Sequence, residues 1–188
     1  AIVMVACIFG LNSSAQAQFA VTTNSGSGLA ATYTSLANAI TALNAATISG
    51  PVVITCPTGT ETAPSGGYSI TAQGTSVNTI TIQGNGAANS VITAANPAGG
   101  SGSLTDGIFK LIGADYVTIQ GFTMQENALN ATTTSGSNNM TEWGVAFLYA
   151  GTAATANGAK NNTIQKKTIA LNRTNAKQYG TYSSTLHT

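Results

Sequence analysis

The few charged side chains in this sequence limit the chemistry that it can perform. The sequence has five acidic residues, and no two of them are close together: Glu61, Asp106, Asp115, Glu126 and Glu142. A glycosidase needs two carboxyl groups that face each other across the bond being cleaved. A polysaccharide lyase needs carboxylates that hold Ca²⁺, together with a basic side chain that removes a proton. Either kind of active site would therefore have to be assembled by the fold.

Asp106 and Glu142 occupy related places in the sequence. Each comes shortly before a glycine that begins an apolar stretch, Gly107 in the first case and Gly144 in the second. If these stretches form neighbouring strands, the two carboxyl groups lie about 5 Å apart, the spacing between strands. Such a pair can hold a cation or act as a catalytic dyad, and the alternative is two solvated turn acids. With Glu126, they are the candidate catalytic residues of this sequence.

Histidine and cysteine offer little further chemistry. His187 is the only histidine and lies next to the end of the sequence, so a histidine-based triad or metal site cannot be built. Cys56 follows the β-branched run 52–55, which is typical of a small buried residue rather than a nucleophile. Cys7 lies in a leader segment, so no disulfide is expected. We predict no cofactor and no metal, with Ca²⁺ expected only if the protein is lyase-like.

Aromatic residues provide the other candidate site. An aromatic side chain has an apolar face and, in tyrosine and tryptophan, a polar tip, which suits both a buried core and a sugar-binding surface. If they are exposed, these side chains can form a sugar-stacking platform, and burial in the core is the alternative. The candidates for carbohydrate contacts are Trp143, Tyr149 and Tyr182.

The composition bounds the class of protein. Of 188 residues, 6% are charged, against about 25% in an ordinary soluble domain. Because 43% are hydrophobic, the chain does not have the composition of a disordered protein. A net charge of +1 gives no reason to expect a nucleic acid or an anionic membrane as partner. The possible partners are instead a polysaccharide or a cell-surface matrix, and the oligomeric state stays open.

Residues 1–17 resemble a secretory signal peptide. An apolar run over residues 1–11 is followed by polar residues and by Ala15-Gln16-Ala17, which is typical of a cleavage site after Ala17. The run is too short to span a bilayer. We therefore expect a secreted or outer-surface protein with no membrane span in residues 18–188; the alternative is a buried first strand. A positive leader start and an initiator Met are missing, so we expect that the true start is absent.

A repeated phrase organises the remainder of the chain. Thr-Ile-Gln-Gly occurs at 81–84 and 118–121, and Thr-Ile-Gln-Lys occurs at 163–166. A phrase that returns after about 40 residues is typical of stacked repeats, each of which buries its apolar side against its neighbours. Ile82, Ile119 and Ile164 should then form an internal ladder with Thr and Gln facing outward. Lys166 replaces the glycine of the third copy, and Lys167 follows it, so we expect either a shifted register or a local irregularity of the sequence there.

The only convincing helix spans about 34–48, with Leu36, Ile40 and Leu43 on one face. This helix, the run 52–54 and repeats such as 115–122 resemble the right-handed parallel β-helix of the pectate-lyase-like superfamily, in particular exported surface proteins of the Bacteroidetes. The resemblance implies an all-β, single-stranded right-handed β-helix (a solenoid) with an N-terminal capping α-helix at about 34–48. Residues 18–188 would be the cap and first coils, truncated at the C-terminus.

The resemblance indicates a fold more specifically than a function, because one fold carries many activities. Low charge and the lack of a carboxylate cluster in the sequence favour a secreted or cell-surface protein with a non-enzymatic structural, adhesive or carbohydrate-binding role. One alternative is the N-terminal part of a polysaccharide lyase or glycoside hydrolase whose catalytic coils lie beyond residue 188. The other is an ice-binding solenoid, which the abundance of Thr suggests.

Overall fold

A computed structural model of the chain describes residues 19–98, 106–132, 139–151, 155, 157–172, 174 and 179–183. The predicted leader, residues 1–17, lies outside this part of the chain, as does His187. The described residues are mostly β-structure. They also contain one α-helix, α1 (Leu36–Ala45), and one short 3-10 helix, η1 (Gly26–Gly28).

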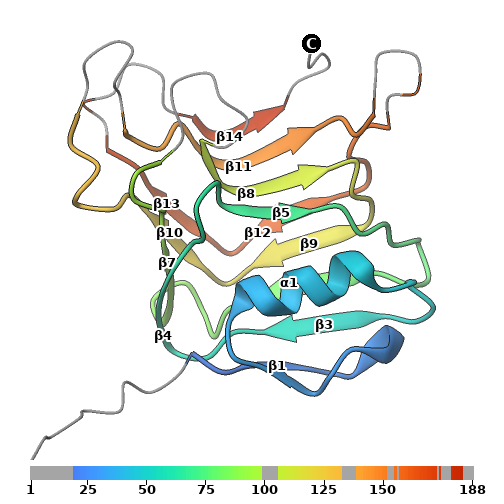
Figure 1. Cartoon of the computed structure of the whole chain (residues 1–188). Coiled ribbons are helices and arrows are strands. Elements are labelled where there is room, and N and C mark those ends of the chain that lie inside the picture. The colour runs from blue at the N-terminus through green and yellow to red at the C-terminus, as the bar shows by residue number, and fades with distance from the viewer. Residues whose placement is uncertain are drawn as a thin grey trace, which may run out of the picture.

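The strands form three separate sheets, shown in Figure 1. Sheet A contains, in chain order, β1 (Val21–Thr23), β2 (Thr32–Tyr33), β3 (Val52–Thr55), β6 (Ile80–Gln83), β9 (Val117–Gln120) and β12 (Thr163–Gln165). Sheet B contains β4 (Gly59–Thr62), β7 (Ser90–Thr93), β10 (Thr123–Gln125) and β13 (Thr168–Ala170). Sheet C contains β5 (Tyr68–Ile70), β8 (Gly107–Ile112), β11 (Trp143–Leu148) and β14 (Tyr179–Ser183). From β3 onward, each strand pairs in parallel with the strand three places later.

The predicted fold class is wrong. The repeats predicted one right-handed, single-stranded parallel β-helix, whereas the described residues form three separate sheets and no single solenoid. Sheet A is mixed, because β1 pairs antiparallel with both β2 and β3. Periodicity could not reveal these antiparallel strands, since β1 and β2 precede the first copy of the repeated phrase. The helix was predicted too long, because α1 ends at Ala45.

The repeated phrase does form the predicted internal ladder. Ile82 pairs with Ile119, which pairs with Ile164. The first two side chains are fully buried, and each contributes about 1.5–3 kcal/mol by leaving water. On the outer face, Gln120 donates a hydrogen bond to Gln83 over 3.0 Å, and Gln165 donates one to Gln120 over 2.8 Å. The phrase is therefore repeated because each copy must match the one beside it.

The third copy keeps the same register in spite of its two lysines. Gly121 donates a backbone hydrogen bond to Lys166 over 2.9 Å, and Thr123 pairs with Thr168 immediately afterwards. The predicted shift of register is therefore wrong. Lys166 adopts the left-handed conformation of the corner (φ 48°), as Gly121 does (φ 74°). Lys167 is level with Phe122 and half-buried, which is possible for a lysine whose stem packs while its ammonium group reaches water.

Helix α1 covers the end of the molecule where β1 and β3 lie (Figure 1). Ser35 caps it by accepting a hydrogen bond from Asn38. The carboxylate of Glu61, on β4, accepts from the backbone N–H of Leu36 over 3.1 and 3.2 Å and from the Tyr68 hydroxyl over 2.9 Å. A negative charge at a helix N-terminus is stabilising. Glu61 therefore fixes α1 on both sheet B and sheet C.

Candidate functional site

The acids singled out in the sequence meet at the corner where sheet B gives way to sheet C. Glu126 directly follows β10 of sheet B, whereas Asp106 and Glu142 directly precede β8 and β11 of sheet C. Because Gly107 pairs with Trp143, Asp106 and Glu142 lie level on neighbouring strands. The two residues therefore lie side by side at the start of neighbouring strands, as the repeats predicted.

The glycines that marked these strands are offset by one residue. Val145 pairs with Phe109, which places Gly144 level with Ile108 rather than with Gly107. A shift of one residue exchanges the two faces of a strand. An overlay on the glycines therefore assigns β8 the wrong faces, and only the pairing shows which side chains point outward.

Asp106 is a fully buried acid with one unsatisfied oxygen. Its Oδ1 accepts the backbone N–H of Glu142 over 3.1 Å, and its Oδ2 has no hydrogen-bond partner among the residues that the structure describes. The pKa of Asp106 is raised to about 8, chiefly by burial and also by the negative charges of Glu142 and Glu126, although the backbone hydrogen bond from Glu142 acts in the opposite direction. Asp106 therefore carries a proton at neutral pH.

Glu126 has a structural position in the same corner. Its Oε1 accepts from the Asn130 amide over 2.9 Å and from the Thr141 hydroxyl over 2.9 Å, and its Oε2 accepts the backbone N–H of Thr141 over 2.9 Å. Asn130 is itself buried and donates to the carbonyl of Ala95 over 2.8 Å. The Glu126 carboxylate thus holds together the two ends of the segment that connects β10 to β11.

These contacts limit the chemistry of Asp106, Glu126 and Glu142, which together we call the acidic corner. Asp106 is 0% exposed and Glu142 is 3% exposed, so neither carboxyl group can touch a polymer in this conformation. Glu126 is engaged with its own loop. Within the described part of the chain, no group of three or more His, Cys, Asp or Glu residues could hold a metal ion. Asp106 keeps a proton, and its hydrogen bond with the backbone of Glu142 fixes the start of β11.

Two of the three aromatic candidates come together on the outer face of sheet C. The rings of Trp143 and Tyr182 stack with centroids 4.6 Å apart and planes 5° apart. Trp143 is buried at 5% exposure, whereas Tyr182 is half-buried. Tyr179, on the same strand as Tyr182, is 51% exposed, with its ring 6.2 Å away. Tyr149 follows the opposite end of β11 and packs beside Gly158, so it does not belong to this cluster.

Lys110 is a residue of this face that the sequence analysis missed. It pairs with Ala146, which pairs with Tyr182 on the next strand. A Cβ built on Gly107 would lie 3.6 Å from both Lys110 Cγ and Trp143 Cε3, so the lysine stem lies beside the indole. Burial lowers the pKa of Lys110. A lysine inside an otherwise apolar strand was the signal that could have revealed it.

Three further side chains with possible chemistry have structural positions: Cys56 and Tyr68 lie in the core, and Asp115 is half-buried. Cys56 is buried, as predicted, and burial together with the Glu61 charge raises the pKa of its thiol. Tyr68 is buried against Phe109, with ring centroids 5.0 Å apart. Burial and the hydrogen-bonded Glu61 raise the pKa of Tyr68. Asp115 accepts the backbone N–H of Lys160 over 2.7 Å. All three side chains serve the fold.

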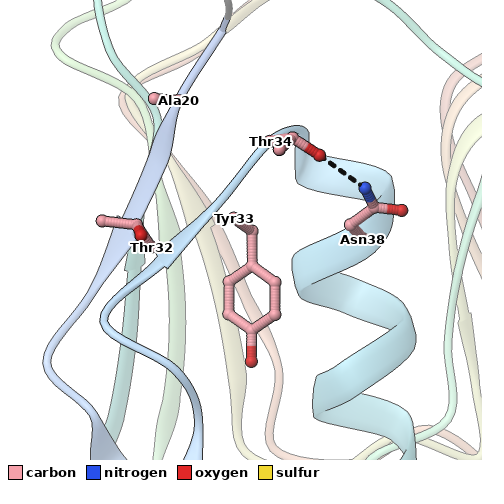
Figure 2. A pocket seen from close by; sticks show the side chains of 5 residues that line it. All are labelled: Ala20, Thr32, Tyr33, Thr34 and Asn38. Carbon is pink, nitrogen blue, oxygen red and sulfur yellow. Dashed lines mark hydrogen bonds between the residues drawn. The ribbon is translucent and has the colours of Figure 1, made fainter.

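A hollow lies at the other end of the molecule, between β2 and α1 (Figure 2). It measures about 340 Å³ and is lined by Ala20, Thr32, Tyr33, Thr34 and Asn38. A second hollow of about 310 Å³, beside β5, includes Asn44, whose amide donates to the carbonyl of Ser69 over 2.8 Å and accepts from Thr71 over 2.9 Å. Asn44 thereby occupies the edge of β5.

No helix among the described residues is both long and apolar enough to cross a membrane. Comparison with known proteins found no family model, no curated protein and no solved structure that matches this chain. The resemblance to pectate-lyase-like proteins is therefore untested by these comparisons, and the function must be argued from the site itself.

Proposed function

We propose that this protein is a secreted or cell-surface protein that binds carbohydrate without transforming it. The observation that carries the proposal is the flat stack of Tyr182 on Trp143 beside the exposed ring of Tyr179. Rigid rings that cover apolar surface and present polar tips are suited to sugars, which have apolar faces and hydroxyl edges. The sequence of residues 1–17, which resembles a signal peptide, supports the location.

The rings of Trp143, Tyr179 and Tyr182 form a platform that is held by the packing beneath it. The Trp143 indole contacts the outer face of β8 and is covered by the Tyr182 ring. Tyr182 therefore cannot turn without uncovering the indole. Lys110 fills the space beside the indole with its stem, and lysine stems commonly cover apolar surface in this way. A ring fixed before the ligand arrives loses less conformational entropy on binding.

The buried acids support a role without catalysis. Glycosidases place two carboxyl groups around the scissile bond, whereas the carboxyl groups of Asp106 and Glu142 are covered. Their contribution to the site is indirect, because Glu142 precedes Trp143 and donates its backbone N–H to Asp106. The acidic corner positions the first residue of β11 and with it the indole on which the platform is built.

Binding of the full chain to a panel of soluble polysaccharides, followed by calorimetry with the best ligand, tests the proposal. We expect Tyr179→Ala and Tyr182→Ala each to weaken binding by about 3- to 10-fold, which corresponds to the loss of one aromatic contact. Val77→Ala is the matched control, since Val77 is an exposed apolar residue (77%) far from β14 in the sequence. Equal binding by all variants would contradict the site. Turnover of any of the polysaccharides would contradict a role without catalysis.

A further inference from the structure

The hollow between β2 and α1 combines an aromatic ring with neutral polar groups. Tyr33 is half-buried, and Figure 2 shows its ring in the space between the strand and the helix. Thr34 and Asn38 lie on the helix side, and Ala20 lies on the side of β1. The volume of about 340 Å³ is at the lower end of the range for small-ligand sites.

The Tyr33 ring is held in place at its hydroxyl end. The Tyr33 hydroxyl accepts a hydrogen bond from the backbone N–H of Ala30 over 3.0 Å. The hydroxyl of Thr23 donates to the carbonyl of Ala30 over 2.7 Å. The loop between β1 and β2 is therefore fastened to both strands. Because the hydroxyl is engaged, the ring offers its face to the hollow and not its polar tip.

The polar groups of the hollow have donors and acceptors that bind no other described residue. The Asn38 side chain donates one hydrogen to Thr34 Oγ1 over 2.7 Å, and this bond is drawn in Figure 2. A primary amide has a second N–H and an oxygen that accepts, and the threonine hydroxyl has a hydrogen to donate. Asn38, Thr34 and Thr32 are all exposed. These donors and acceptors are neutral, and the residues that line the hollow carry no charge.

We propose that this hollow is a second carbohydrate site, which takes one unit of a neutral sugar against the Tyr33 ring with hydrogen bonds to Asn38 and Thr34. The inference extends the proposed function and depends on it. Strand β2 forms one edge of sheet A, next to α1, whereas β14 forms the edge of sheet C at the opposite end of the molecule. Two sites on one rigid chain hold a polymer at two points, which raises its apparent affinity above that of either site alone.

The test is a titration of the ¹⁵N-labelled full chain with cellohexaose and with laminarihexaose, two neutral glucans, followed by nuclear magnetic resonance. We expect chemical-shift changes at the Asn38 side-chain amide and around Tyr33. Asn38→Ala removes the amide from an exposed helix position and should weaken binding at the hollow by about 2- to 10-fold, the effect of one hydrogen bond. Thr41→Ala is the matched control, because Thr41 lies three residues further along α1 and outside this hollow.

The result separates the two sites. Shifts confined to β11 and β14, or equal affinity of Asn38→Ala and the unaltered chain at the hollow, would overturn the second site and leave the proposed function standing. Shifts at the hollow that survive in Tyr182→Ala would support it as an independent site. If neither glucan changes any signal, the second site for neutral sugars is rejected. A polysaccharide that binds in the calorimetric panel would then still support the platform on sheet C.

Discussion

The backbone N–H of Glu142 donates to Oδ1 of Asp106 over 3.1 Å, while Oδ2 of the same buried carboxyl group has no hydrogen-bond partner within the described part of the chain. The pKa of Asp106 is raised from 3.8 to about 8, chiefly by burial and also by the nearby charges of Glu142 and Glu126. The folded protein therefore keeps a proton that the unfolded chain releases in mild acid. This relationship connects the stability of the protein to pH.

The first prediction concerns that dependence. Between about pH 4 and pH 8 the folded state binds one proton more than the unfolded state at Asp106, so stability falls as pH rises. The contribution of this group to the free energy of unfolding should decrease by roughly 1.4 kcal/mol per pH unit in that window. Urea unfolding at several pH values measures it. Asp106→Asn keeps an acceptor for Glu142 and should remove this part of the slope; identical slopes would contradict the assignment.

The second prediction uses the single tryptophan. Trp143 is buried beneath the Tyr182 ring, so Tyr182→Ala should expose the indole and move its fluorescence emission to longer wavelength. Loss of the stacked ring should also lower the free energy of unfolding by about 1–3 kcal/mol. Tyr149→Ala, outside the cluster, serves as the control and should leave the emission unchanged. An unshifted spectrum in Tyr182→Ala would show that the two rings do not stack in solution.

The third prediction concerns the attachment of the helix. Glu61→Ala removes the acceptor of both the Leu36 N–H and the buried Tyr68 hydroxyl. Leaving two donors without a partner should destabilise the protein by about 2–4 kcal/mol in urea unfolding. Thr62→Ala, at the exposed neighbouring position, should change the stability by less than about 0.5 kcal/mol. Equal effects of the two substitutions would mean that Glu61 does not hold α1.

The fourth prediction concerns the corner at Lys166. Its φ of 48° lies in the left-handed region, which is strained for a residue with a side chain and free of strain for glycine. Lys166→Gly should therefore raise the free energy of unfolding by about 0.5–1 kcal/mol, in spite of the greater freedom of glycine in the unfolded chain. Lys166→Ala removes the charge but keeps the strain, and it should bring no such gain. A gain in both variants would assign the effect to charge.

Local and periodic features were predictable from the sequence. The ladder of Ile82, Ile119 and Ile164 follows from the spacing of the phrase, because identical side chains stack when strands pair in register. Helix α1 follows from the apolar spacing of Leu36, Ile40 and Leu43, which the structure buries on one face. The proximity of Asp106 and Glu142 also followed from the repeats, because both precede neighbouring strands.

The rest required the tertiary structure. Whether strands belong to one sheet or to three depends on hydrogen bonds between distant residues, and β1 and β2 had no periodic signal at all. The faces of β8 depended on a register offset of one residue, which a repeat in the sequence cannot resolve. Burial decided whether Asp106 and Glu142 could reach a ligand, because the sequence of an acidic residue is the same whether its carboxyl group is covered or exposed.

The sequence by itself determined the period, the inner ladder, the helix and the candidate residues, because these depend on side-chain types at short or regular spacings. Only the tertiary structure decided that Asp106 is protonated, that Glu126 closes its own loop, and that Tyr182 covers Trp143. These properties arise when segments far apart in the chain exclude water together, and the packing that does so is set by all of the strands at once.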